Sequence, residues 1–350
     1  MIAAAFLISA AVFSICVRVP EVFSDSDTAL AAAAFTLTDG KYYIESTTPP
    51  EEASVTASDN NTHETIAAPV AAEKRDRDKS GYYDSFGDHS GEVKYPIDEK
   101  TIYPDGIDVE GCCVKNYTSL SPDFSGLLSA PLTFKTEQGS DSPQVLIYHT
   151  HTGESYIDED VDYFYESYYS RTNNNDFNVV AVGDAIAEGL EKNGIKTVHH
   201  KTVHDSTYNG SYDRSVQTVQ ADMQKYPSIK VVLDIHRDAL GADDRKVKTV
   251  FTHDGKKGAQ IMILSGCDPD NERGFVNWSN NLSFALKIQH TAETLYPGMT
   301  RPLDFGYFAY NEYVCDGSLL IEIGTDANSV DEAVYSGTLL ADVLAKVLVG

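Results

Sequence analysis

The sequence has few basic residues: 27 Lys and Arg stand against 53 Asp and Glu, which gives a formal net charge of −26. A protein that binds nucleic acid needs a basic face to contact phosphates, so this balance argues against a nucleic-acid partner. About half of the excess acid lies in residues 20–110, a stretch rich in Ser, Thr and Ala and poor in periodic apolar pattern. Such a composition favours a solvated, extended tether.

Cysteines are sparse as well. The five cysteines include no C-x-x-C pair, which disfavours a cysteine-based zinc site. Cys112 and Cys113 are adjacent and poorly placed to bridge each other, so a Cys267–Cys315 disulfide is the pairing that stays open. This usage is typical of an exported protein that does not rely on disulfides.

No apolar run reaches the roughly 20 residues that a membrane-spanning helix needs. Residues 2–17 are nearly all apolar, but they are too short and lack the basic flank that precedes the apolar core of a signal peptide. Two interpretations of residues 1–19 stay open. We favour a membrane anchor because no clear small-residue cleavage site follows, and the alternative is a signal peptide. Both place the rest of the chain outside the cytoplasm.

Beyond about residue 111, apolar runs alternate with amphipathic segments. This alternation predicts an α/β fold, with a mostly parallel sheet covered by helices on both faces. We therefore predict a signal or anchor at 1–19, a tether at 20–110 and a catalytic domain at 111–350. The predicted strands are 144–148, 195–198, 229–235, 247–251, 260–265 and 318–323, and the predicted helices are 178–192, 211–225, 280–295 and 329–348.

Two of the apolar runs end in histidine. The first is followed by His149, His151 and Glu154, and the last two form an H-x-x-E pair; the second ends in His236. Imidazole nitrogens and a carboxylate oxygen are the mixed ligand set of a catalytic zinc, which keeps a fourth position open. We predict His151, Glu154 and His236 as zinc ligands. His149 is an alternative ligand or pocket residue, because it shares a face with His151 if the strand continues.

A carboxylate in a third apolar run completes the predicted site. Glu322 lies within residues 319–324, where a lone charge is costly unless it serves a metal or a partner. We predict that it takes the proton from water and hands it to the leaving amine. Asp234 could orient His236 from the same side of its strand, and Arg237 could bind a substrate carboxylate or carbonyl oxygen. Further pocket candidates are Arg214, Asn311 and Trp278.

Four motifs occur together in a recognisable order. They are Tyr-His-Thr-His-Thr-Gly-Glu-Ser-Tyr at 148–156, Asp-Ser-Thr-Tyr-Asn-Gly-Ser-Tyr-Asp-Arg-Ser at 205–215, Val-Leu-Asp-Ile-His-Arg-Asp at 232–238 and Leu-Ile-Glu-Ile-Gly at 320–324. Residues 114–350 thereby resemble the stage II sporulation protein P family, exported and membrane-anchored cell-wall hydrolases of endospore-forming bacteria. Any one of the motifs alone would be weak, whereas the four in order are specific.

The resemblance implies a zinc-dependent N-acetylmuramoyl-L-alanine amidase, with endopeptidase activity on cross-links as an open addition. It implies that the protein degrades septal peptidoglycan during engulfment, in the space between the septal and forespore membranes. The implied partners are a lytic transglycosylase, stage II sporulation protein D, and membrane engulfment proteins. The implied fold is an α/β sandwich with zinc at strand ends, and the motif positions are His151, Glu154, His236 and Glu322.

Two alternatives to the amidase stay open. A zinc carboxypeptidase or endopeptidase acting on stem peptides would use the same residue types. A non-catalytic, anchored wall-binding scaffold with a degenerate metal site is disfavoured, because a scaffold has no reason to keep four ionisable groups in buried strands.

Overall fold

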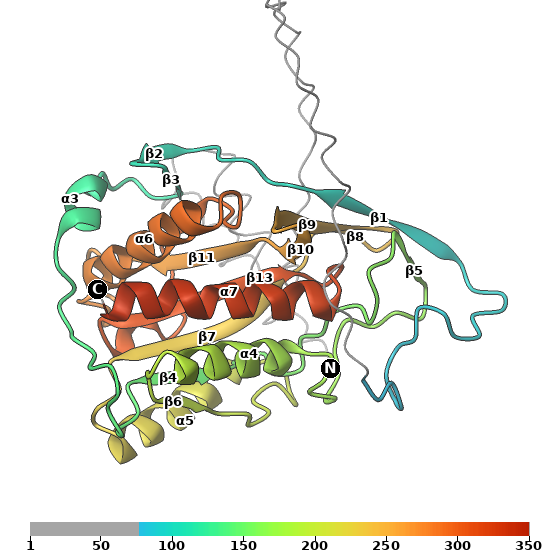
Figure 1. Cartoon of the computed structure of the whole chain (residues 1–350), viewed down its shortest axis with the longest axis horizontal. Coiled ribbons are helices and arrows are strands. Elements are labelled where there is room, and N and C mark those ends of the chain that lie inside the picture. The colour runs from blue at the N-terminus through green and yellow to red at the C-terminus, as the bar shows by residue number, and fades with distance from the viewer. Residues whose placement is uncertain (1–76, 350) are drawn as a thin grey trace, which may run out of the picture. The chain divides into compact units, whose positions relative to one another are not determined.

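The computed structural model describes residues 77–349 (Figure 1). The predictions for residues 1–19, and for the tether up to residue 76, lie outside the described residues. Within 77–349, no helix combines the length and the apolar composition needed to cross a membrane.

A large mixed sheet forms the centre of the fold. In spatial order its strands are β2 (Ile107–Val109), β3 (Cys112–Asn116), β12 (Leu303–Gly306), β11 (Ile261–Gly266), β13 (Gly317–Thr325), β7 (Val231–Asp238), β4 (Val145–Tyr148) and β6 (Thr197–His199). Five of the seven neighbouring pairs are parallel, whereas β2–β3 and β11–β13 are antiparallel. The predicted mostly parallel sheet is therefore confirmed.

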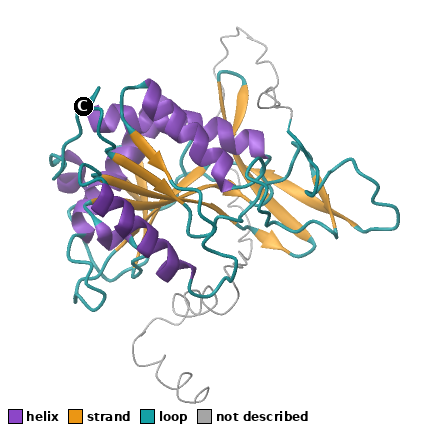
Figure 2. Cartoon of the chain, turned by 90° about the horizontal axis from the view of Figure 1, so that it is seen from below, coloured by secondary structure: helices purple, strands orange, loops and turns teal. Residues whose placement is uncertain are grey.

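Helices cover both faces of this sheet (Figure 1 and Figure 2). One face packs against α4 (Val179–Lys192), α6 (Trp278–Leu295), α7 (Val330–Val349) and the short α3 (Phe124–Ser129), and the other packs against α5 (Ser211–Lys225). The alternation along β4 shows why both faces are buried. Ile147 joins the larger apolar core, whereas Leu146 and Tyr148 pack with Val219 of α5. Each fully buried aliphatic side chain of this kind contributes roughly 1.5–3 kcal/mol.

Local capping residues set the ends of the helices. Asn178 begins α4, because its side chain accepts a hydrogen bond of 3.0 Å from the backbone N–H of Val180. Ser329 and Glu332 form a reciprocal capping box at the start of α7, with hydrogen bonds of 3.2 and 2.9 Å. Gly194, with a φ of 74°, follows α4 in the left-handed conformation that glycine tolerates best.

A smaller sheet lies beside the first and corrects the predicted domain boundary. Its strands are β10 (Lys256–Ala259), β9 (Arg245–His253), β1 (Lys94–Lys100), β5 (Tyr163–Tyr165) and the two-residue β8 (Gly241–Ala242). Because β1 pairs with both β9 and β5, the folded part begins well before residue 111 and the tether prediction is wrong for this segment. Only Ile97 of β1 is buried, so the strand leaves no apolar run to detect.

The cysteines of the described chain are unpaired. Cys112, Cys113 and Cys267 are buried, and Cys315 is half-buried. The Cys267–Cys315 disulfide is therefore absent, and burial raises the pKa of the Cys267 thiol to about 12, which keeps it protonated and unreactive.

Candidate functional site

Three neighbouring parallel strands bring the predicted catalytic residues to one edge of the large sheet. His236 and Glu322 lie near the ends of β7 and β13 and are direct partners in the register of these strands. His151 and Glu154 belong to the turn that follows β4, the strand on the other side of β7. The carboxyl ends of parallel strands are where α/β proteins place their sites, and all four residues meet this condition.

His236 is enclosed between two carboxylates. Its Nδ1 lies 3.3 Å from Glu154 Oε2, and its Nε2 lies 2.9 Å from Asp234 Oδ1, although not in line for a hydrogen bond. Burial alone would lower the pKa of His236, but Asp234 and Glu154 raise it well above its usual value. Asp234 is itself fixed, because it accepts hydrogen bonds from the backbone and side chain of Thr150. This arrangement leaves Nδ1 of His236 facing Glu154.

His151 has a buried nitrogen without a partner. Its Nδ1 makes no hydrogen bond, which is costly for a buried polar atom. The ring stacks on Tyr208 with a centroid distance of 4.6 Å and stands perpendicular to the ring of His236 at 5.3 Å. Burial lowers the pKa of His151 to about 4, so at neutral pH the imidazole is in the uncharged form that binds metals.

Glu154 supplies a negative charge to the same place. Burial opposes its ionisation, but Arg237 and His236 bring the pKa of Glu154 well below its usual range. Its Oε2 also accepts a hydrogen bond of 3.2 Å from the backbone N–H of Arg237. The carboxylate therefore remains charged although it is buried.

The residues of this site fit a zinc ion in chemistry but would have to draw closer to hold it. Two imidazoles and a carboxylate are a known catalytic zinc set. Nδ1 of His151 makes no hydrogen bond, so it is available to bind a cation. The ligand atoms of His151, Glu154 and His236 do not all lie within 4.8 Å of one another. Binding would therefore require a small movement of these side chains and the release of the proton of His236.

Glu322 has the properties of a proton-transfer group. One of its carboxylate oxygens, Oε2, is buried and makes no hydrogen bond. Burial raises the pKa of Glu322 to about 8, with Asp238 and Glu154 adding to the effect and His236 opposing it. A carboxyl group that titrates near neutral pH can both accept and return a proton during a reaction.

His149 does not join this group. β4 ends at Tyr148, after which the chain turns, so the shared face expected for His149 and His151 is lost. His149 faces α4 instead: its Nδ1 lies 2.8 Å from the carbonyl oxygen of Ile235, and its Nε2 lies 2.8 Å from Nε2 of His199. Gly183 of α4 makes room for the pair, because a Cβ there would lie 2.5 Å from His199. Both ring nitrogens of His149 are thus already engaged.

Arg237 supports the loop after β4. Its Nε donates to the carbonyl oxygen of Ser155 at 3.1 Å, and its Nη2 donates to that of Ser170 at 2.7 Å. The residue is buried, with 7% of its surface exposed. The predicted contact of Arg237 with a substrate carboxylate or carbonyl oxygen stays a prediction.

Two further pocket candidates also hold the fold around the site. Arg214 donates to the carbonyl oxygens of His204 and Asn209, and so braces the loop that carries Tyr208. Asn311 donates to the carbonyl oxygen of Tyr212 and to Oγ of Ser215 in α5. Trp278 packs against Phe305 of the apolar core. Arg214 and Asn311 thus have contacts within the fold, and the roles of all three as pocket residues stay predictions.

Sequence reasoning missed an aromatic and charged layer on top of the site. Tyr208 covers His151, and the guanidinium of Arg171 lies 5.7 Å from the Tyr208 ring. Arg171 also pairs with Asp205, which accepts a hydrogen bond of 3.0 Å from the backbone N–H of Gly153. Residues 205–215 are rich in Tyr, Asp and Asn, and this composition was the available sign of such a layer. It did not show which of these residues would lie over the site.

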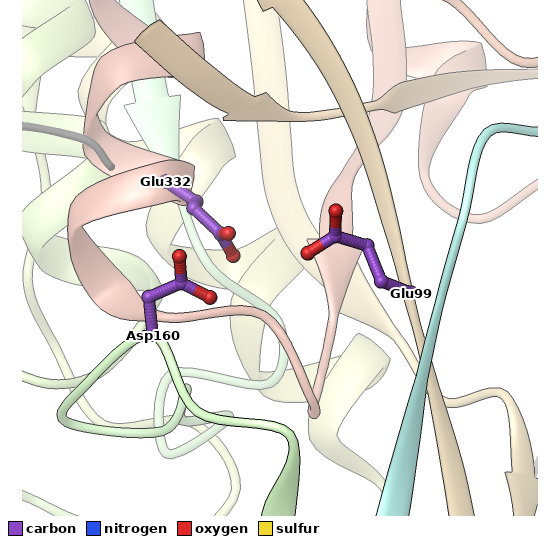
Figure 3. A group of neighbouring side chains, drawn as sticks. All are labelled: Glu99, Asp160 and Glu332. Atoms are coloured by element: carbon purple, nitrogen blue, oxygen red, sulfur yellow. The ribbon is translucent and has the colours of Figure 1, made fainter. Parts of the chain in front are cut away.

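A second acidic cluster lies elsewhere in the fold. Glu99, Asp160 and Glu332 have carboxylate oxygens within 4.8 Å of one another (Figure 3). Lys248 lies among them, with Nζ 3.0 Å from Glu99 and 3.7 Å from Glu332 and a close ion pair with Asp160. Lys257 adds contacts of 2.8 Å to Glu99 and 3.1 Å to Asp160. The ammonium groups occupy the place that a metal ion would take.

Comparisons with solved structures find distant similarities to cell-wall amidases. The N-acetylmuramoyl-L-alanine amidase AmiC2 of Nostoc punctiforme has a TM-score of 0.34 and 13% identity, over 60% of this chain and 97% of that one. The N-acetylmuramoyl-L-alanine amidase of Clostridium difficile 630 has a TM-score of 0.37 and 17% identity, over 59% and 95%. Similarities at this level do not support a functional argument.

Sequence comparison is more specific. The chain is 29% identical over 225 residues to stage II sporulation protein P of Bacillus subtilis (strain 168), which covers 59% of this chain and 51% of the relative. The matched region thus spans about half the length of that relative. The family model of stage II sporulation protein P matches residues 32–345, nearly the whole chain. We conclude that the chain belongs to the stage II sporulation protein P family.

Proposed function

We propose that this protein is a zinc-dependent N-acetylmuramoyl-L-alanine amidase that degrades septal peptidoglycan during sporulation. The observation that carries the proposal is the meeting of His151, Glu154, His236 and Glu322 at the ends of three adjacent strands, with buried polar atoms of His151 and Glu322 left without partners. Buried polar atoms are usually hydrogen-bonded, so these two are suited to binding an ion or to transferring a proton. Membership of the stage II sporulation protein P family supports the cell-wall substrate.

The proposed roles follow from the chemistry of each side chain. His151, Glu154 and His236 would hold the zinc ion, and Asp234 keeps the ring of His236 oriented. Bound zinc supplies a Lewis acid that polarises the scissile carbonyl and makes water more acidic. Glu322 accepts a proton from the attacking water and passes it to the amine of L-alanine as that amine leaves.

The proposal extends to where the protein works. A peptidoglycan substrate requires the catalytic groups to lie outside the cytoplasm, in the space between the septal and forespore membranes. We place it beside a lytic transglycosylase, stage II sporulation protein D, and membrane engulfment proteins. A transglycosylase cuts glycan strands whereas an amidase removes their peptides, so the two activities complement each other.

Mass spectrometry of digested peptidoglycan tests the activity. The purified full chain is incubated with purified peptidoglycan and zinc, beside a sample treated with a chelator. Free stem peptides and peptide-free glycan strands that disappear on chelation would establish the amidase. Shortened stems or opened cross-links, with the lactoyl amide intact, would replace it by a peptidase. If no product forms, either alone or with stage II sporulation protein D added, the wall-binding scaffold would be favoured.

A further inference from the structure

A hollow of about 410 Å³ lies next to the layer that covers the candidate site. One wall comes from residues 81–89, in the segment that sequence reasoning assigned to a tether, and the other comes from residues 167–172. Its volume lies in the range of about 300–1,000 Å³ that small-molecule sites occupy. The site residues assigned above do not line it, so its shape needs a separate explanation.

The hollow is connected to the candidate zinc ligands through Arg171. Arg171 lines the hollow, and its guanidinium lies 5.7 Å from the ring of Tyr208, which stacks on His151. The backbone of Arg171 forms a β-bridge with Glu154, and Thr172 donates a hydrogen bond of 2.8 Å to the carbonyl oxygen of Gly153. A polymer bound across the catalytic groups would therefore reach the hollow with its neighbouring units.

The walls of the hollow are held rigidly. The ring of Tyr82 stacks on Phe177 at 4.6 Å, and the ring of His89 stacks on Tyr165 at 4.0 Å. A surface that is fixed before it binds loses less conformational entropy on binding. These contacts tie residues 81–89 to the main body of the fold and give the hollow a lasting shape.

Two carboxylates in the lining are oriented and have acceptor capacity to spare. Asp84 Oδ1 accepts hydrogen bonds from the backbone N–H of Phe86 and from Lys79, and Asp88 Oδ1 accepts from Ser90. In the described part of the chain these hydrogen bonds all reach Oδ1, which leaves Oδ2 of each aspartate to accept further hydrogen bonds. Hydroxyl groups are suitable donors.

Tyr169 forms an aromatic rim to the hollow. It lines the hollow while 70% of its surface is exposed, a large exposed fraction for an aromatic side chain in a folded region. The face of such a ring can pack against the C–H groups of a sugar. An aromatic face beside oriented acceptors suits a sugar, which presents C–H groups on its faces and hydroxyl groups at its edges.

We propose that this hollow is a subsite for an N-acetylated amino sugar of the glycan strand, with Tyr169 stacking on the ring and Asp84 and Asp88 accepting from its hydroxyls. The proposal rests on the proposed function for the identity of the polymer. A stem peptide is a poorer occupant, because it carries carboxylates that Asp84 and Asp88 would repel and because Arg171 already pairs with Asp205.

Isothermal titration calorimetry with tetra-N-acetylchitotetraose tests this assignment on the full chain. This sugar carries no lactoyl group and no stem peptide, so the proposed activity contributes no heat of turnover. We expect the wild-type chain to bind the sugar and Tyr169→Ala to bind it at least about fivefold more weakly, the loss of one aromatic contact. Tyr169→Phe should retain binding. Tyr103→Ala is the matched control, because Tyr103 is 75% exposed and does not line the hollow.

The outcomes separate this inference from the amidase proposal. Absence of sugar binding by the wild-type chain, or equal binding by Tyr169→Ala, would overturn the subsite. Tyr169-dependent binding of an isolated stem peptide would overturn it as well. Tyr169-dependent sugar binding in a protein that hydrolyses nothing would keep the subsite and reject the amidase. If the amidase is active, Tyr169→Ala should raise the KM for peptidoglycan about fivefold and leave kcat unchanged.

Discussion

The described chain contains two clusters of carboxylates that differ in how their charges are balanced. In the first, Glu99, Asp160 and Glu332 surround the ammonium group of Lys248, and Lys257 adds a second ammonium group beside Glu99 and Asp160. In the second, Glu154 and Glu322 lie beside His151 and His236 at the strand ends, and no lysine enters. We call the first the closed cluster, because lysine side chains contact its carboxylates. We call the second the open cluster, because no lysine of the described chain contacts its carboxylates.

The balance of charge distinguishes the structural cluster from the chemical one, whereas the distances between ligand atoms do not. By distance alone, the Glu99 cluster is the better metal site, because its three ligand atoms lie within 4.8 Å of one another. Its carboxylates nevertheless already contact the ammonium groups of Lys248 and Lys257. The strand-end group is looser, and its unpartnered buried atoms include Nδ1 of His151 and Oε2 of Glu322, whereas Oε1 of Glu332 in the first cluster makes no hydrogen bond but lies 3.7 Å from the ammonium group of Lys248. Unpaired buried polar atoms cost stability, and at the strand ends a bound ion would offset that cost.

The largest effect is expected from removing a ligand of the open cluster. His236→Ala deletes the side chain between Asp234 and Glu154, so stoichiometric zinc binding and hydrolysis of peptidoglycan should both fall to background. Zinc content is measured by atomic emission on the gel-filtered protein, and circular dichroism confirms the fold. A folded variant that still holds one zinc ion per chain would disprove the ligand assignment.

Removing the proton-transfer group should affect catalysis alone. Glu322→Gln keeps the shape of the side chain but cannot accept a proton, so turnover should drop by about 10²–10⁴-fold while zinc content stays at the wild-type level. Peptide release and bound zinc are measured on the same preparation. Loss of zinc from a folded Glu322→Gln protein would make Glu322 a ligand, and another group would then have to act as the base.

The closed cluster should respond through stability instead. Lys248→Met leaves Asp160 and Glu332 without their buried positive partner, and this should lower the free energy of unfolding by about 3–5 kcal/mol. Lys257→Met is the matched control: its side chain is more exposed, and it should cost about 1 kcal/mol or less. Urea denaturation measures both values.

Two outcomes would overturn this comparison between the clusters. If the wild-type chain gained thermal stability from added Mg²⁺, and Glu99→Gln abolished that gain, the lysine-filled cluster would bind metal after all. Equal destabilisation by Lys248→Met and Lys257→Met would show that the burial of Lys248 does not matter.

Much of the large sheet could be predicted from the sequence, because its strands are buried on both faces and leave apolar runs. Residues 211–225 form a helix as predicted, and the predicted strand 318–323 lies inside β13. The small sheet could be predicted only in part: the predicted strand 247–251 lies inside β9, whereas β1 buries only Ile97 and leaves no apolar run. The antiparallel direction of β11 beside β13 leaves no mark in the local pattern either.

The candidate site shows the same division. His236 and Glu322 could be selected because ionisable residues stand out in apolar strands, and their register brings them together. The use of Arg237 could not be foreseen, since its partners are backbone carbonyls of loop residues far away in the sequence. His149 was ambiguous for a similar reason: whether it joins His151 depends on where β4 ends, and its partner His199 is 50 residues away.

The smallest expected effect concerns how well the open cluster is ordered. Tyr208 stacks on His151 although 47% of its surface is exposed, so it orders the ring without supporting the core. Tyr208→Ala should weaken zinc binding about two- to twelvefold, the equivalent of about 0.5–1.5 kcal/mol for an aromatic contact, and leave the free energy of unfolding nearly unchanged. Tyr208→Phe should keep wild-type affinity. Competition with a chelating dye measures these constants. Unchanged or tighter zinc binding by Tyr208→Ala would mean that the ring covers His151 without ordering it, and that the open cluster is held in place by Asp234 and Glu154 alone.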